Sequence, residues 1–267
     1  LYVFDEDLIQ HPDCSPRHLQ FQWHSLLDLK NTLDFAAFEV NLCHGKTQTI
    51  FSKLIENFSV NTVFSYQETG IRLTFDIDLA LKKLFKQHQV KWIEFQRDGV
   101  LRGIKNREKW DKAWFSMAHS APIENTFSLR KTILWHHEFP ITQELNKIVE
   151  SYPKSYQPPG ESFAWKYLKN FVELRIQNYS RHISKPELSR ISCSRLSPYL
   201  AWGNINIRQV FQYVYRDALN KSNKNPHNNF LTRLTWHCHF IQKFETVCEY
   251  ETHCINRVFE TVWADKN

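Results

Sequence analysis

The first third of the chain alternates short apolar runs with stretches in which apolar residues recur at helical spacing. The runs are typical of β-strands: Leu1–Phe4, Glu39–Cys43, Thr62–Tyr66 and Val90–Phe95. Between them the spacing predicts helices over residues 17–33, 47–58 and 74–88, the second capped by Thr47. Regular alternation of strand and helix predicts an α/β fold with a parallel sheet.

The pattern changes after Trp114. Residues 120–160 hold several prolines and Gly160, which indicates a long connection with at most short helices. From Glu161 onward the strand signal is gone, and apolar residues repeat at helical spacing over three stretches: residues 163–179, 206–219 and 230–248. Asn206 with Gln209 resembles a capping box at the start of the second stretch.

This organisation divides the chain into three segments. We expect an α/β domain over residues 1–120, a linker over 121–160 and a helical domain over 161–267. A doubly wound domain usually opens with a strand and a helix before a unit of this kind, so we expect the first strand to be missing.

Composition narrows the class of protein. Apolar residues make up 42% of the chain and charged residues 23%, which is typical of a globular protein rather than a disordered one. No apolar run is long enough to cross a membrane, and the acidic first residues do not resemble a signal peptide. The six cysteines lack paired spacing, so we expect reduced thiols and a cytoplasmic protein.

Charge and aromatic content suggest a kind of partner. A net charge of +6 together with 15% aromatic residues suits a polyanion or a flat conjugated ligand. The same charge is modest for a chain of this length, so a protein without nucleic-acid affinity stays open.

The sharpest local motif runs from Ser192 to Gly203. Ser197 reads as an N-cap followed by Pro198 at the first helical position. Upstream lie the hydroxyl of Ser194 and the cation Arg195, and such groups beside a helix N-terminus can bind phosphate. The alternative is an ordinary capped helix.

The segment SCSRLSPYLAWGNINIRQVF resembles the TSRLSPYL segment of the photolyase/cryptochrome flavoproteins. The resemblance implies that FAD is bound, through its diphosphate, by a set of matching residues. These are Tyr179, Cys193, Ser194, Arg195, Leu196 and Ser197. Cys193 replaces the usual threonine of the family, which exchanges a hydroxyl for a weaker thiol donor.

The resemblance extends to the N-terminal half through YVFDEDL, SYQETG and VKWIEFQRDGVLRGIKNREKW. It implies a Rossmann-like α/β antenna domain, which in this family holds a folate, a deazaflavin or no chromophore, followed by a helical FAD-binding domain. Compared with that family, the chain lacks the first strand and the later helices that enclose the flavin ring. We therefore expect a fragment that binds FAD weakly by itself.

A second family motif is matched by Phe230–Phe240, FLTRLTWHCHF. It implies that Phe230 touches the flavin and that Trp236 takes part in catalysis by packing against a flipped pyrimidine dimer in damaged DNA. Arg233 and His237, also DNA-facing, depart from the family's Glu and Arg, which reverses the charge beside the substrate at Arg233. A core position for Trp236 is the alternative.

Metal and nucleophile chemistry find little support. His and Cys residues crowd residues 237–254, but His237 and His239 point about 200° apart around a helix and cannot share a zinc ion. We expect no metal. Gly-rich phosphate loops and nucleophile elbows are absent from the sequence.

Three functions follow for the chain. The first is a light-driven, FAD-dependent lyase of the deoxyribodipyrimidine photolyase type that repairs UV-damaged DNA. The second is a cryptochrome-like blue-light sensor without repair activity, and the third is a nucleic-acid-binding module without a flavin. We expect a monomer in each case.

Overall fold

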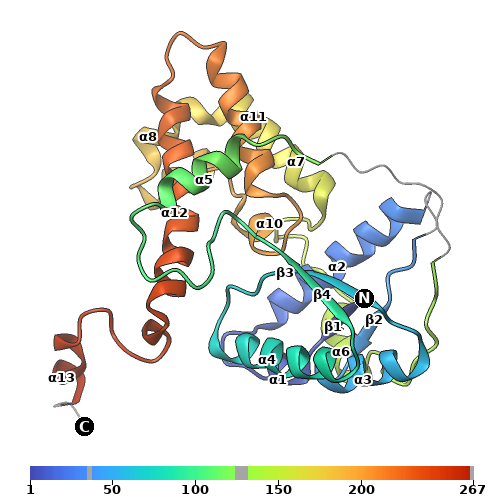
Figure 1. Ribbon diagram of the computed structural model, residues 1–267. Coiled ribbons are helices and arrows are strands. Elements are labelled where there is room, and N and C mark those ends of the chain that lie inside the picture. Colours follow the sequence, from blue (N-terminus) through green and yellow to red (C-terminus); the bar gives the residue numbers. More distant parts are fainter. Residues whose placement is uncertain (35–37, 124–131, 265–267) are drawn as a thin grey trace.

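The computed structural model describes residues 1–34, 38–123 and 132–264. Figure 1 shows two groups of elements, one at the lower right around the strands and one at the upper left built from helices. We call β1–β4, α1–α4 and α6 the strand part, and α5 with α7–α12 the helical part. None of the described helices combines the length and apolar character needed to cross a membrane.

The strands form two parallel pairs. The first pair is β1 (Tyr2–Phe4) with β2 (Leu42–His44), and the second is β3 (Thr62–Tyr66) with β4 (Lys91–Phe95). The expected parallel pairing is therefore present, but the described strands make two separate pairs rather than one sheet. β2 begins three residues later than the sequence predicts, because residues 38–41 are not in strand conformation.

Helices of the strand part pack against the strands, but one face of the β3–β4 pair, which carries Phe64, Tyr66 and Phe95, stays exposed. The helices are α1 (Glu6–Ile9), α2 (Pro16–Leu33), α3 (Thr47–Asn57), α4 (Arg72–Gln87) and α6 (Gln143–Val149). Leu81, Leu84 and Phe85 of α4 pack with Trp92 of β4 in one small core. α6 buries Leu145 and Val149 against Phe4 and Leu19, so a short helix from the connecting segment completes a second core.

Asp5 joins three elements at the end of β1. One carboxylate oxygen accepts hydrogen bonds from the backbone of Asp7 and Leu8, which caps α1. The other accepts from the backbone N–H of Thr47 at 2.8 Å and from its hydroxyl at 2.6 Å. Thr47 is therefore the first residue of α3 and not its cap, because its hydroxyl donates to Asp5 while Lys46 takes the capping position.

The helical part has a single continuous core. Its helices are α5 (Trp110–His119), α7 (Glu161–Asn170), α8 (Ile176–His182), α9 (Pro186–Ser192), α10 (Ser197–Ala201), α11 (Ile207–Leu219) and α12 (Asn225–Thr246). α12 packs between α8 and α11, and α11 packs against α5. Trp110 and Trp114 are fully buried in this core with Phe171, Tyr199 and Phe230. The capping box of Asn206 and Gln209 is confirmed.

One π-helical turn, Phe171–Arg175 (η2), separates α7 from α8. The sequence predicts an uninterrupted helix through this region because apolar spacing alone does not show an inserted residue. Beyond α12 the chain continues as a 3₁₀ turn (η3, Cys248–Glu251) and α13 (Val258–Ala264), which Figure 1 shows apart from the helical core.

Polar contacts that connect the two parts include those of Gln242, Arg97 and Ser25, and that of Asp28 of α2, whose carboxylate accepts from the backbone N–H of Glu161 at 3.2 Å. The side-chain amide of Gln242 accepts from the backbone N–H of Leu101 at 2.6 Å and donates to its carbonyl at 2.9 Å. Arg97, just after β4, donates to the carbonyl of Ala201 at 2.7 Å. Ser25 of α2 donates to the side chain of Asn204 at 3.3 Å. The segment after β4 is thus fixed to α10 and α12.

Candidate functional site

The turn between α9 and α10 carries most of the predicted phosphate-binding residues. Arg195 lies in the left-handed region with a φ of 60°. The side-chain amide of Gln157 stabilises this conformation. It donates to the backbone carbonyl of Arg195 at 2.7 Å and accepts from the Arg195 guanidinium at 3.2 Å. Ser194 accepts from the backbone N–H of Leu196 at 3.4 Å. These hydrogen bonds therefore define the backbone conformation of the turn.

Ser197 is not the N-cap of α10, contrary to the sequence prediction. Leu196 occupies the capping position and Ser197 is the first helical residue, with no side-chain capping bond. The physical reason is that Leu196 is buried in the core, with 1% of its surface exposed, which fixes the turn one residue earlier. The exposed Ser197 hydroxyl has no hydrogen-bond partner among the described residues.

Arg175, at the end of the π-turn, fixes the start of this turn. Its guanidinium donates to the carbonyl of Cys193 at 2.5 Å and to that of Tyr167 at 3.1 Å. Its Nε is buried and finds no acceptor among the described residues. The sequence carries no local sign of this role of Arg175, because it depends on the π-turn that brings Arg175 toward Cys193.

Tyr179 and Phe230 meet below the turn. Their rings lie 5.5 Å apart at 84°, and both also contact Phe171. Burial raises the pKa of Tyr179 to about 12, with a further contribution from Cys193 nearby. The structure thus brings together Tyr179 of α8, Phe230 of α12 and the Cys193–Ser197 turn that follows α9. Both rings belong to the core of the helical part.

The predicted DNA-facing residues do not all lie together. The guanidinium of Arg233 stacks over the ring of Trp236 at 4.2 Å, and both side chains are exposed, Trp236 by 46%. Because almost half of it is exposed, Trp236 is not a core residue. His237 is half-buried instead, and burial lowers its pKa while Asp98 opposes that shift. His237 therefore faces the segment after β4 rather than Arg233.

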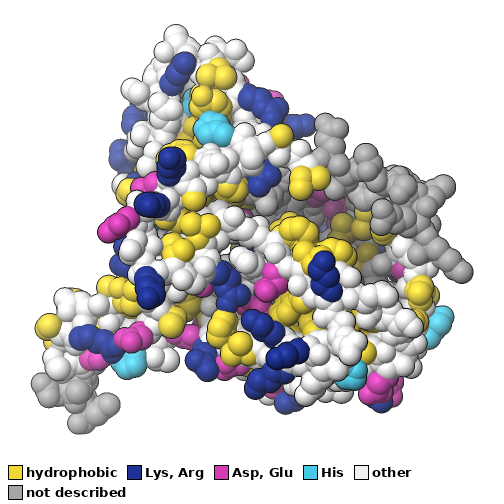
Figure 2. Space-filling model, in the orientation of Figure 1, with side chains coloured by type: hydrophobic (Ala, Val, Ile, Leu, Met, Phe, Trp, Pro, Cys, Tyr) yellow, Lys and Arg dark blue, Asp and Glu magenta, His cyan; other side chains and the backbone are white. Residues whose placement is uncertain are grey.

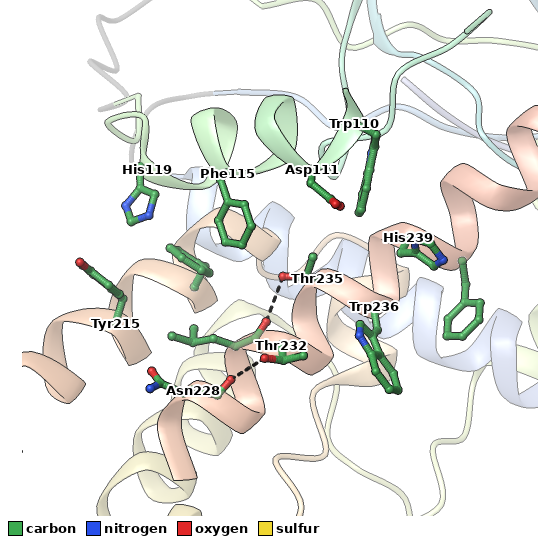
Figure 3. Close-up of a pocket in the computed structure, with 13 residues that line it drawn as sticks. Trp110, Asp111, Phe115, His119, Tyr215, Asn228, Thr232, Thr235, Trp236 and His239 are labelled. Carbon is green, nitrogen blue, oxygen red and sulfur yellow. Dashed lines mark hydrogen bonds between the residues drawn. The ribbon is translucent and has the colours of Figure 1, made fainter. Parts of the chain in front are cut away.

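Trp236 also lines a groove of about 790 Å³ between α5, α11 and α12. Figure 3 shows Phe115 and Tyr215 on one side of it and Trp110, Trp236 and His239 at the other end. The groove is largely apolar since the hydroxyls of its threonines are bonded to carbonyls of their own helix. Apart from Trp236, which the Phe230–Phe240 motif singles out, the only sign of these residues in the sequence is the high aromatic content.

A second cleft of about 700 Å³ lies between the two parts. Tyr66 of β3 and Arg97, just after β4, line it on one side, and Trp202 and Asn204, just after α10, line it on the other. Burial raises the pKa of the nearby Asp98 carboxyl, which the guanidinium of Arg97 at 3.1 Å opposes. The cleft combines aromatic rings with polar groups of both charges.

The His and Cys side chains near the end of α12 do not form a metal site in the described part of the chain. Within residues 1–34, 38–123 and 132–264, no group of three or more His, Cys, Asp or Glu side chains has an arrangement that could hold a metal ion. The ring of His239 contacts Arg107 and Trp110, whereas His237 interacts with Asp98. Figure 2 shows Lys and Arg side chains between exposed hydrophobic groups over the helical part.

No protein-family model matches the chain, and no curated protein matches it. Several solved structures match the chain. A class III photolyase from Agrobacterium tumefaciens shares 19% identity with a TM-score of 0.71 over 97% of this chain. A Synechocystis cryptochrome shares 14% with a TM-score of 0.73 over 92%. An archaeal photolyase from Sulfolobus tokodaii, solved with two FAD molecules, shares 15% with a TM-score of 0.66 over 96%.

These likenesses show the fold. Parallel strand pairs followed by helices are arranged as in photolyases and cryptochromes, which confirms at the level of fold the resemblance found in the sequence. The chain spans 55% of the length of each of these three structures.

Proposed function

We propose that this chain forms part of a light-driven flavoprotein of the photolyase type that repairs UV-damaged DNA with FAD. The observation that carries the proposal is the convergence of Tyr179, Phe230 and the Cys193–Ser197 turn. It supports the flavin site that the resemblance implies, and the fold likeness over 92–97% of the chain adds to it.

The side chains around the turn fit a diphosphate. Donors without a partner among the described residues include the Ser197 hydroxyl, the Tyr179 hydroxyl and the buried Arg175 Nε. Ser194 can still donate while its oxygen accepts from Leu196. Hydrogen bonds from such donors to a phosphate are charge-assisted, and they are stronger than hydrogen bonds between neutral groups. When bound, FAD would supply blue-light absorption and electron transfer.

An equilibrium titration with FAD, followed by flavin fluorescence, tests the cofactor assignment. We expect saturable binding and, in Ser197→Ala, a loss of about tenfold in affinity, the size of one hydrogen bond to a charged group. Ser162→Ala is the matched control, since Ser162 is an exposed serine in the first turn of α7. A folded chain that does not bind FAD at any concentration tested would overturn the proposal.

Damaged DNA is the proposed partner, and Trp236 its contact. Stacking of a base on an exposed tryptophan contributes roughly 1–3 kcal/mol. A cyclobutane dimer is poorly stacked and is therefore extruded from a duplex at a lower cost than a normal base. We expect Trp236→Ala to weaken binding of dimer-containing single strands more than Trp202→Ala, a control at a similarly exposed tryptophan.

A blue-light sensor without repair activity is the second candidate. Arg233 favours it, because the guanidinium covers one face of Trp236 and provides no acceptor for a pyrimidine dimer. Arg233→Glu is expected to raise light-dependent repair if this position limits it. Unchanged repair in that variant, with DNA binding retained, would favour the sensor.

A folate or deazaflavin antenna remains part of the proposal. The 700 Å³ cleft between the two parts offers Tyr66 and Trp202 to a flat ring. Titration of the chain with a reduced folate, compared between Trp202→Ala and Trp165→Ala, tests this placement.

A further inference from the structure

The groove between α5, α11 and α12 has a row of side chains from α5 along one wall. Asp111, Phe115 and His119 follow one another at four-residue spacing, so they lie on one face of the helix, and all three line the groove. Arg107 precedes this row by four residues, just before α5 begins. Figure 3 shows Asp111 and Phe115 pointing from α5 toward α12. This wall therefore presents a cation, a carboxylate and an aromatic ring in that order.

The opposite wall is a row of side chains on α12. Thr232, Thr235 and His239 recur every three or four residues and also line the groove. The hydroxyls of Thr232 and Thr235 donate to the carbonyls of Asn228 and Leu231 at 2.9 and 3.2 Å. Their oxygens keep lone pairs that can accept hydrogen bonds from a ligand. The middle of the groove therefore offers acceptors from both walls.

Arg107 and His239 form a group of donors at one end of the groove. A guanidinium nitrogen of Arg107 lies 3.0 Å from Nε2 of His239. Because a guanidinium can only donate, Nε2 accepts, and the proton of the neutral ring lies on Nδ1. Among the described residues neither Nδ1 nor the other N–H groups of Arg107 have a hydrogen-bond partner. Both side chains can therefore donate to one anion.

The carboxylate of Asp111 is available for a ligand. Asp111 is exposed, and no hydrogen bond or ion pair joins its carboxylate to another residue in the described part of the chain. A carboxylate accepts from N–H and O–H groups, so it suits an amino group of a ligand and not a carbonyl oxygen. Lys105, Lys109 and Lys112 add positive charge to the same segment, which favours an anion at the donor end.

The groove also suits a flat ring. Phe115 is 46% exposed, so its ring can be stacked on from the groove. The volume of about 790 Å³ is in the range of small-molecule sites. Stacking on an aromatic side chain is favourable for every nucleic-acid base, because each base has a π-face. The groove thus fits a ligand that is planar, carries an amino group and ends in an anion.

We propose that this groove binds a nucleotide whose base carries an amino group. The base stacks on Phe115 and donates from its amino group to Asp111. The phosphate accepts charge-assisted hydrogen bonds from Arg107 and a further one from His239. Cytosine and adenine carry such an amino group, whereas thymine has an oxygen in its place. A dimer of thymines lacks the amino group, so this site is distinct from the proposed lesion contact, and it shares no residue with the Cys193–Ser197 turn.

Calorimetric titration of the 267-residue chain with three probes tests the proposal. The first is cytidine 5′-monophosphate (CMP). Uridine 5′-monophosphate (UMP) has an oxygen in place of the amino group, and cytidine lacks the phosphate. We expect saturable binding of CMP and an affinity about tenfold lower for each of the other two, the size of one hydrogen bond to a charged group. CMP shares no base with FAD, so the titration does not report on the flavin site.

Each contact has its own variant. Asp111→Ala should lower the affinity for CMP to that for UMP, whereas Asp34→Ala, at an exposed aspartate at the end of α2, should change neither. Arg107→Ala should remove most of the preference for CMP over cytidine, and Arg190→Ala, at an exposed arginine of α9, is its control. Phe115→Ala should weaken binding of all three probes by about fivefold or more. Circular dichroism checks that each variant is folded.

A single strand of oligodeoxycytidine distinguishes the two sources of such a nucleotide. Tighter binding of the strand than of CMP, lost in Arg107→Ala and Asp111→Ala, would identify the ligand as a nucleotide within a nucleic-acid strand. Binding of the strand no tighter than that of CMP would identify it as a free nucleotide.

Two results would overturn the proposal. A folded chain that binds neither CMP nor the strand at millimolar concentration has no such site. Equal affinity for CMP in Asp111→Ala, Arg107→Ala and the unchanged chain would mean that any bound nucleotide lies elsewhere. Neither result bears on the FAD titration, because these two side chains do not belong to the Cys193–Ser197 turn or its neighbours.

Discussion

The strand part and the helical part bury their apolar side chains in different ways. The helical part has one continuous core, from Trp110 to Cys238, which also takes in Phe21 of α2. The strand part divides its buried residues among three small cores, around Phe4, Phe85 and Ile50. Small cores contribute little stability by themselves. Helices α5 and α7–α12 are therefore held mainly by apolar packing, whereas the strand part depends more on polar junctions such as that of Asp5.

The largest expected effect on stability comes from removing a buried ring of the helical part, compared with an exposed ring of the strand part. Phe171→Ala removes a fully buried ring that contacts Tyr179 and Phe230, and we expect a loss of about 3–5 kcal/mol in the free energy of unfolding. Urea denaturation followed by circular dichroism measures it. Phe64→Ala, on the uncovered face of β3, should change it by less than about 0.5 kcal/mol. Similar losses in the free energy of unfolding in both variants would show that the two parts do not differ in how burial stabilises them.

Asp5→Ala is expected to have the next largest effect. It removes the carboxylate that bonds both α1 and Thr47 of α3, so we expect a loss of about 2–3 kcal/mol, confined to the strand part. Hydrogen exchange at Thr47 should accelerate while exchange in α11 stays unchanged. Asp7→Ala, which removes only an exposed ion pair with Lys46, is the control. Faster exchange in α11 as well would show that the parts unfold together.

Gln242→Leu tests the connection between the parts. It removes both hydrogen bonds to Leu101 and should cost about 1–3 kcal/mol. Denaturation monitored separately in strand and helix residues by NMR should show the two transitions moving apart. Gln212→Leu loses two hydrogen bonds from α11 to the end of α5 and one from Arg216, and all three lie within the helical part. It should not separate the transitions.

The smallest effect concerns Asp78 of α4. Burial raises the pKa of the Asp78 carboxyl from 3.8 to about 6, and the charges of Glu68 and Glu94 add to this shift. The positive charge of Arg102 opposes it. The folded chain therefore holds more protons than the unfolded chain between these values, and stability falls as pH rises through this window. We expect Asp78→Asn to stabilise the chain by about 1 kcal/mol at pH 7.

That gain should disappear below about pH 4, where Asp78 is protonated in both the folded and the unfolded chain. Thermal unfolding across this pH range measures it. Asp76→Asn, an exposed position paired with Arg72, is the control and should not show the same pH dependence. A gain for Asp78→Asn that is equal at all pH values would contradict the assignment to this carboxyl.

Much of the fold was predictable where periodicity is strong. β3 matches its predicted range, and α2 and α3 differ by one residue at one end. The capping box of Asn206 was also visible, because it depends on two residues three positions apart. Ser197 and Thr47 were wrong as caps, since the buried Leu196 and the distant Asp5 decide those helix starts. Tertiary contacts of this kind leave no local pattern.

The candidate site was predictable only in part. A resemblance carried over residue by residue located Tyr179, Phe230 and the turn at Arg195, and the structure brings them together. It could not show that His237 turns toward Asp98 or that Arg233 covers Trp236, because both depend on packing across α12. Arg175 was missed for the same reason, since its contacts reach across eight and eighteen residues of sequence.

The π-turn at Phe171–Arg175 is geometrically equivalent to one residue inserted into a regular helix. One extra residue in a helix rotates everything beyond it by about 100°. Deleting a single residue from this turn would restore a regular helix from α7 into α8 but would swing Tyr179 away from Phe230 and the Arg195 turn. The orientation of a whole helix, and with it one wall of the candidate site, is thus set by a change of one residue in chain length.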